Sequence, residues 1–228
     1  VFVILLCMAC EPDVVGGQKP DDGDVNDTLP VAQYGLEYLY DMATLAHITL
    51  TVTEDDWNDF LSYYDQNPHN EEYIPASFEY EKSGEKFELD SIGIRLRGNT
   101  SRRRPEGGVG EMHSANGDWH HAHFGVKFDE YVEDQTFCTA DRIYLKWHKD
   151  DANYCREVYC YDLFRRFGVW SAPRACYTRL SIFVEGDDKP VYMGVYALIE
   201  GMKDSYLRSR GEAGKYTTED VFLGKASY

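Results

Sequence analysis

The chain has few basic residues for its length. Its 228 residues include 23 Lys and Arg but 40 Asp and Glu, which gives a formal net charge of −17. Binding to nucleic acid or to an anionic membrane surface requires clustered cations. The charge balance therefore argues against both as partners. The length is sufficient for one domain of moderate size.

The chain also lacks an apolar run long enough to span a bilayer. The strongest run, VFVILLCMAC at residues 1–10, has the length and position of a signal-peptide remnant. Cys10 follows a small residue and precedes acidic sequence, so it resembles the lipid-attachment cysteine of bacterial lipoproteins. We expect a lipid anchor at Cys10 and an extracytoplasmic location in the cell envelope. A signal peptide cleaved elsewhere is the alternative, because Cys7 stands where lipoproteins usually carry Leu.

Hydrophobic periodicity is absent from residues 11–33, which are rich in acids and turn-forming residues. Such a composition cannot bury a core, so this stretch is predicted to be a flexible acidic tether. The folded domain is then expected over residues 34–228. No internal repeat divides it.

The four cysteines after the first ten residues, Cys138, Cys155, Cys160 and Cys176, show no C-x-x-C spacing. A Cys138–Cys176 disulfide and buried free thiols both fit the sequence.

The Gly-rich loop at 104–122 ends in HSANGDWHHAH, which holds four of the seven histidines. This cluster raises a zinc-dependent hydrolase as a less favoured alternative, but no familiar ligand spacing is present, so no metal ligand is assigned.

The folded region shows alternating strand patterns and three amphipathic helical patterns. Strands are predicted at 47–53, 76–82, 86–98, 123–128, 143–147, 176–185 and 190–200, and helices at 54–64, 152–167 and 203–211. The last two strands form the clearest hairpin, around an acidic turn. These patterns predict an α+β domain in which a twisted antiparallel sheet is packed by the helix at 152–167.

That helix carries one carboxylate, Glu157, on an apolar stripe with Phe164. A buried carboxylate is costly unless a cation meets it. We predict that Lys127, on the strand at 123–128, is this partner. Arg142 and Arg156 are alternatives, and a solvated Glu157 beside Arg156 also fits the sequence.

Four segments in succession resemble the CotH (spore coat protein H) kinase family. They are GIRLRGNTSR at 93–102, HFGVKFDEY at 123–131, REVYCYDLFRRFGVWSAPR at 156–174 and YMGVYALIE at 192–200, within a similarity over about residues 45–225. The resemblance implies an atypical protein-kinase-like fold, of which this chain would hold the N-terminal portion. It also implies that ATP and a divalent metal, Mg or Mn, serve to phosphorylate Ser or Thr on secreted or surface proteins.

The resemblance gives the candidate residues their roles. Lys127 would hold the nucleotide phosphates, and Glu157 would position it through an ion pair. Arg97 and Asn99 belong to the family's most recognisable motif and are expected near the phosphates. Glu200 falls at the segment that would meet the adenine.

The sequence departs from the family pattern at its end. The family's metal-binding and catalytic aspartates follow a segment that resembles VFLGK at 221–225, and the chain stops at Tyr228. We therefore expect this fragment alone to be inactive as a kinase. A non-catalytic cell-surface binding module on the same fold is the main alternative.

Overall fold

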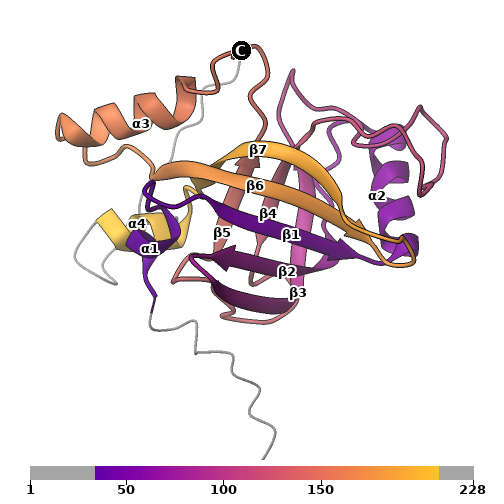
Figure 1. Ribbon diagram of the computed structural model, residues 1–228, viewed down its shortest axis with the longest axis horizontal. Coiled ribbons are helices and arrows are strands. Elements are labelled where there is room, and N and C mark those ends of the chain that lie inside the picture. Colours follow the sequence, from indigo (N-terminus) through magenta and orange to yellow (C-terminus); the bar gives the residue numbers. More distant parts are fainter. Residues whose placement is uncertain (1–33, 211–228) are drawn as a thin grey trace, which may run out of the picture.

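The structure, a computed structural model, describes residues 34–210 (Figure 1). The predicted signal peptide, the predicted lipid-attachment residue Cys10, the predicted tether at 11–33 and the segment at 221–225 lie outside the described residues. Among residues 34–210, no helix has the length and apolar character needed to cross a membrane.

Seven strands form a closed barrel with the neighbour order β1-β2-β3-β4-β5-β7-β6 (Figure 1). The strands are β1 (Ala46–Val52), β2 (Ile74–Lys82), β3 (Glu85–Arg97), β4 (His123–Lys127), β5 (Arg142–Lys146), β6 (Ala175–Val184) and β7 (Val191–Glu200). All neighbours are antiparallel except β1 and β6, which run parallel over the whole of β1.

The predicted fold class is therefore wrong. Residues 34–210 do not form a kinase-like α+β fold with a twisted antiparallel sheet and a packed helix, because the pairing of β1 with β6 closes the sheet. Alternation along a strand shows which residues share a face, but it does not show which strand lies next to it. The pairing that closes the barrel joins the first strand to one from the far end of the described chain, and no local pattern encodes it.

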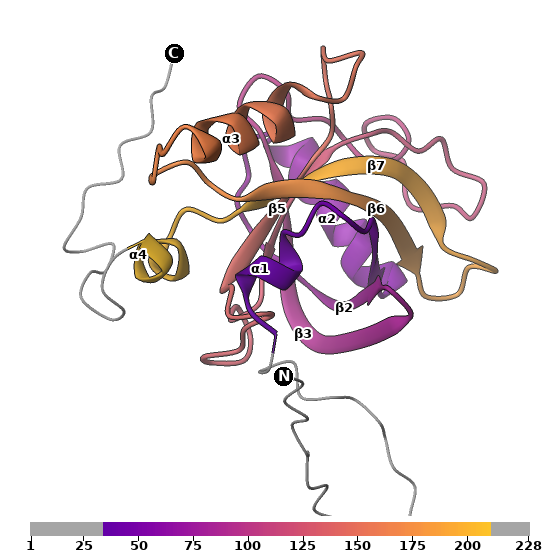
Figure 2. The same ribbon diagram turned by 60° about the vertical axis from the view of Figure 1, so that its left-hand side comes forward.

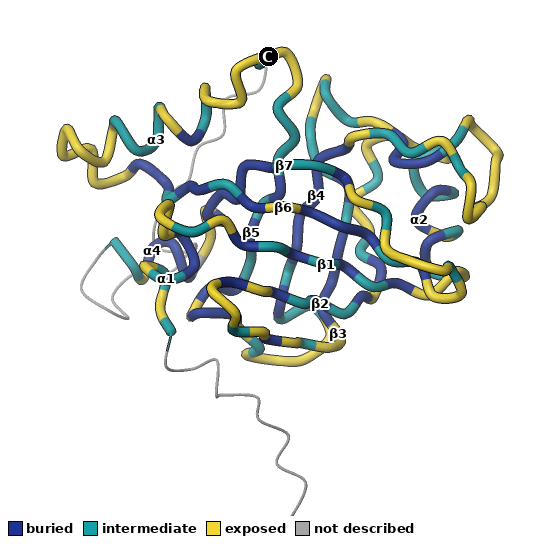
Figure 3. The backbone as a smooth tube through the Cα atoms, viewed as in Figure 1, coloured by how far each residue is buried: buried dark blue, intermediate teal, exposed yellow. Residues whose placement is uncertain are grey.

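The barrel interior is the hydrophobic core. Every second residue of β1 is buried, from Ala46 to Val52, as a two-residue period requires. Figure 3 shows the same alternation of buried and less buried positions along the neighbouring strands. Four aromatic rings contact one another there, Phe78, Tyr80, Phe128 and Phe137, with centroids 5.0–6.4 Å apart. Their large apolar area stabilises the interior.

Helices cover both ends of the barrel (Figures 1 and 2). At one end, α2 (Glu54–Gln66) buries Trp57, Phe60 and Leu61. The Thr53 hydroxyl accepts a hydrogen bond from the Asp56 N–H at 3.1 Å and caps this helix. The short helices α1 (Leu36–Leu39) and α4 (Asp204–Arg210) lie at the other end.

The helix α3 (Arg156–Arg166) lies on the outside of the barrel and packs against β6 and β7 (Figure 2). Val158 is its one buried residue, whereas Phe164 is 48% and Phe167 is 79% exposed. The predicted packing of the Phe164 stripe is therefore wrong, because the adjacent stripe of Val158 and Tyr161 faces the sheet. Cys155 and Cys160 on this segment are free thiols.

The two buried cysteines, Cys138 and Cys176, are also free thiols, so the structure favours that alternative over a disulfide. Burial raises the pKa of both to about 12. Each behaves as a small apolar side chain in the core.

Candidate functional site

The outer face of β3, β4 and β5 brings a group of polar side chains together. Strand alternation turns Ile94, Leu96, Phe124 and Leu145 into the core, which leaves Arg97, His123 and Lys146 outside it or at its edge. The antiparallel register sets Arg97 opposite His123. Because Phe124 lies opposite Leu145, it also brings His123 next to Lys146.

A cavity of about 280 Å³ lies between this face and α3. Its lining combines cationic and hydroxyl groups with apolar ones: Arg97, Gly98, Asn99, Ser101, His123, Phe124, Tyr144, Leu145, Lys146, Glu157, Tyr161, Ile199 and Met202. A second hollow of about 170 Å³ adjoins it and shares Ser101, His123, Lys146 and Glu157. The shared residues therefore lie where the two spaces meet.

Lys146 and Glu157 form an ion pair across this boundary. The Lys146 Nζ donates to Glu157 Oε1, which links β5 to α3. The side chains are 43% and 26% exposed, so solvent screens the pair and its contribution to stability is small. The pair holds a primary ammonium group at the cavity wall.

The predicted pairing of Lys127 with Glu157 is wrong. Lys127 Nζ lies 2.8 Å from Glu130 Oε2 and 3.8 Å from an Asp129 carboxylate oxygen. Lys127 is at the far end of β4 from His123, and four residues of strand span about 13 Å. The same antiparallel register that separates Lys127 from α3 brings Lys146 to it.

Arg142 and Arg156, the alternative partners predicted for Glu157, do not pair with it either. Arg142 is the cross-strand neighbour of Lys127 and so lies at the same distant end. Arg156 donates to the Asp150 carbonyl at 2.8 Å. Lys146 and Lys127 have the same sequence pattern, a lysine on a strand with alternating apolar residues. Sequence reasoning chose Lys127 and missed Lys146 because this pattern does not distinguish the two strands.

Arg97 and Asn99, the predicted phosphate-site residues, both line the cavity. The Arg97 guanidinium lies 3.3 Å from the centroid of the Tyr144 ring, a cation–π contact. Burial lowers the pKa of Arg97, and Arg95 adds to this effect. Gly98 has φ of +109°, and a Cβ there would lie 2.8 Å from Ser101 Oγ. Glycine is therefore required where β3 ends and the chain turns toward the cavity.

The Glu200 carboxylate does not line the cavity. It is 1% exposed and accepts hydrogen bonds from the Arg174 N–H at 2.8 Å and from the Arg174 and Arg210 guanidinium groups at 3.0 and 2.6 Å. Neighbouring Ile199 and Met202 line the cavity instead. The side chain of Glu200 therefore holds the end of β7 in place, and the adenine contact predicted at this segment would come from backbone groups and not from this carboxylate.

The histidine-rich loop at 104–122 is anchored by a buried carboxylate. Glu106 accepts from Trp57 Nε1–H at 2.7 Å, from the Ser114 N–H at 2.9 Å and lies 2.9 Å from His113 Nδ1. The His113 Nε2 lies 3.3 Å from Asp187. Over residues 34–210, no three His, Cys, Asp or Glu side chains form a group that could hold a metal ion. The zinc-hydrolase alternative therefore has no ligand set in this part of the chain.

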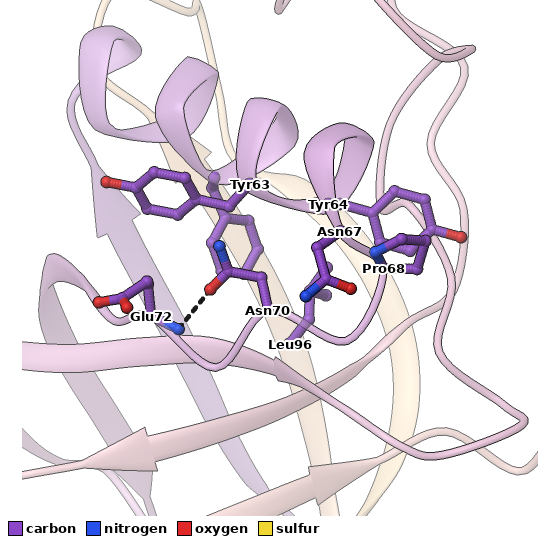
Figure 4. A pocket seen from close by; sticks show the side chains of 8 residues that line it. Tyr63, Tyr64, Asn67, Pro68, Asn70, Glu72 and Leu96 are labelled. Carbon is purple, nitrogen blue, oxygen red and sulfur yellow. Dashed lines mark hydrogen bonds between the residues drawn. The ribbon is translucent and has the colours of Figure 1, made fainter.

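A further hollow lies beneath α2 and is lined by Tyr63, Tyr64, Asn70 and Leu96 among others (Figure 4). Asn70 Oδ1 accepts from the Glu72 N–H at 2.6 Å at its edge. Its volume is about 10 Å³, which suits at most about one water molecule. It is too small for a ligand.

Comparison with known proteins identifies one family. The family model described as "CotH kinase protein" matches residues 94–221, more than half of the chain. No curated protein and no solved structure matches the chain. The matched segment contains every residue that lines the 280 Å³ cavity.

Proposed function

Because the chain belongs to the CotH kinase family, we propose that the cavity beside Lys146 binds the nucleotide of an ATP-dependent protein kinase. The observation that carries this proposal is the Lys146–Glu157 ion pair at the cavity wall. In protein kinases, a strand lysine held by a helix glutamate contacts the nucleotide phosphates. This chain supplies the same two groups from β5 and α3, although its barrel differs from the fold predicted for it.

The cavity lining fits a nucleotide. Lys146 and Arg97 supply positive charge for phosphates, and Asn99 and Ser101 supply hydrogen-bonding side chains. The apolar part of the lining, which includes Ile199, suits a base. The volume of about 280 Å³ is near the lower end of the range for ligand pockets, roughly 300–1,000 Å³. The adjoining hollow extends the space at the cationic side.

The residues of this chain would bind and orient the nucleotide. Lys146 would contact phosphate oxygens while Glu157 keeps its ammonium group in place, and Arg97 would offset phosphate charge. Bound ATP supplies the phosphoryl group that is transferred to a Ser or Thr hydroxyl. The family resemblance also implies Mg or Mn, but within residues 34–210 no cluster of ligands fits a metal ion. No metal contact is assigned to these residues.

Lys146→Ala is expected to raise the dissociation constant for ATP by about tenfold or more, because it removes a charge-assisted contact. Lys127→Ala removes the same charge from a neighbouring strand and is expected to change it by less than about twofold. Isothermal titration calorimetry on both purified variants gives the comparison. Loss of affinity in Lys127→Ala alone would make Lys127 the phosphate contact. Failure of the unaltered protein to bind ATP would favour a non-catalytic surface module.

We also propose that the substrate is a secreted or surface protein and that the protein is anchored to the cell envelope through lipid at Cys10. The support is the family and the apolar run that ends at Cys10. A single lipid chain binds membranes only weakly, so stable anchoring at Cys10 would need a second chain or another contact with the membrane.

Cys10→Ala is expected to move most of the protein from the membrane fraction to the soluble fraction, because the attachment site is lost. Cell fractionation followed by immunoblotting measures the shift. Cys7→Ala is the matched control and should leave the protein with the membranes. Membrane retention of Cys10→Ala would count against the anchor.

A further inference from the structure

His123 is a buried polar side chain that takes no part in the Lys146–Glu157 ion pair. It is 5% exposed, begins β4 and lines both the larger cavity and the adjoining hollow. Its register partner on β3 is Arg97, and Lys146 lies beside it on β5. A buried imidazole between two cations needs a defined protonation state.

One hydrogen bond fixes the tautomer of His123. The Trp147 backbone N–H donates to His123 Nδ1 at 3.0 Å. A backbone N–H can only donate, so Nδ1 carries no proton and the neutral ring carries its proton on Nε2. Burial lowers the pKa of His123 to about 4, and the charges of Lys146, Arg97 and Lys149 act in the same direction, as does His148. The ring is therefore neutral near pH 7.

The Nε2–H edge of the ring faces the chain turn at the cavity. The Cδ2 atom, which is bonded to Nε2, lies 3.3 Å from where a Cβ on Gly98 would be. Nδ1 is on the other edge and is already occupied by the Trp147 N–H. Within residues 34–210, no hydrogen bond joins Nε2 to another protein group, and Nε2 is not one of the fully buried unpaired side-chain atoms, so it is accessible from the cavity that His123 lines. A ligand oxygen that reaches this point would accept a hydrogen bond from Nε2–H in a largely desolvated place, where such a bond is stronger than in water.

We propose that His123 is a positioning residue that donates an uncharged hydrogen bond from Nε2 to a phosphate oxygen of the bound nucleotide, beside Lys146. This inference depends on the proposed nucleotide site. A neutral donor adds a directional contact without a third positive charge next to Lys146 and Arg97. It would thus set the orientation of the phosphate chain, while the two cations supply most of the attraction.

A matched pair of variants separates this role from a structural one. In His123→Gln, the side-chain NH₂ reaches the place of Nε2 and keeps a donor there, but the acceptor for the Trp147 N–H is lost. In His123→Asn, the side-chain oxygen replaces Nδ1 as acceptor, but the donor toward the cavity is lost. We expect His123→Asn to raise the dissociation constant for ATP about tenfold and His123→Gln to raise it less than about threefold. The reverse order would overturn the proposal.

Two further measurements on the unaltered protein test the role of His123 even if a variant folds poorly. NMR of the imidazole nitrogens in the unaltered protein should show an unprotonated Nδ1 without nucleotide, and the Nε2–H signal should shift when ATP is added. The affinity of the unaltered protein should not rise as the pH falls from about 8 to about 6, as it would for a donor that becomes charged in that range. A protonated Nδ1, or an Nε2–H signal that ATP leaves unchanged, contradicts the inference.

The possible failures are distinguishable. If the unaltered protein binds ATP and both His123 variants bind it equally well, the inference on His123 fails and the nucleotide site stands. If the unaltered protein does not bind ATP at all, the proposed function fails and the role of His123 fails with it.

Discussion

Glu200→Ala is expected to lower the free energy of unfolding by about 3–5 kcal/mol, because it leaves charged groups without their partner in the interior. The Glu200 side chain is almost fully buried and pairs with Arg174 and Arg210, whose side chains are 14% and 7% exposed. Chemical denaturation followed by tryptophan fluorescence measures the difference.

Glu37→Ala is the matched control, because Glu37 also pairs with Arg174, at 2.9 Å, but its side chain is 79% exposed. A solvated pair contributes at most about 1 kcal/mol, so this variant should remain close to the unaltered protein. Equal effects of the two substitutions would show that burial of Glu200 does not determine its contribution. The Glu200–Arg210 ion pair also connects β7 to α4. Glu200→Ala should therefore loosen the end of β7, where Ile199 lines the cavity.

Glu106→Ala is expected to cost a similar free energy, about 3–5 kcal/mol, for a related reason. Glu106 is 1% exposed, and its carboxylate is the acceptor for the Trp57 indole N–H and the Ser114 N–H. Removal leaves these buried donors unsatisfied. Glu111→Ala, an exposed acidic position on the same loop, is the control and should cost less than about 1 kcal/mol. A loss below about 1 kcal/mol in Glu106→Ala would contradict this prediction.

The contact between Glu106 and His113 predicts that the stability of the protein depends on pH. Burial acts to lower the pKa of His113, but its contacts with Glu106 and Asp187 outweigh burial and raise the pKa above its usual value. A raised pKa in the folded state means that the stabilisation is complete below the unfolded pKa and is lost as the pH rises through the folded one. The stability difference between the unaltered protein and His113→Gln should therefore be larger near pH 5.5 than near pH 9.

Local sequence patterns were sufficient for most of the elements. The alternating hairpin predicted at 176–185 and 190–200 is present as β6 and β7, and Trp57, Phe60 and Leu61 at helical spacing are the buried face of α2. The CotH family resemblance, which depended on the order of short motifs, is confirmed over residues 94–221. These features depend on residues close in sequence, so a single chain displays them.

The site was predicted in part. Arg97 and Asn99 line the cavity, and Glu157 does meet a strand lysine, but the lysine is Lys146 and not Lys127. Both lysines lie on strands with alternating apolar residues, and their patterns do not differ. The choice between them depends on antiparallel register, which sets Phe124 opposite Leu145 and so carries Lys127 away from α3.

The sequence by itself determined the strands, the main helices and the family, because each follows from periodicity or motif order within short stretches. Only the tertiary structure decided that β1 pairs with β6 to close a barrel, that Val158 and not Phe164 faces the sheet, and that Lys146 reaches Glu157. Those outcomes depend on which distant strands become neighbours and in what register. Backbone hydrogen bonds form between any two strands, so the pairing is selected by packing of the whole core and cannot be read from one segment.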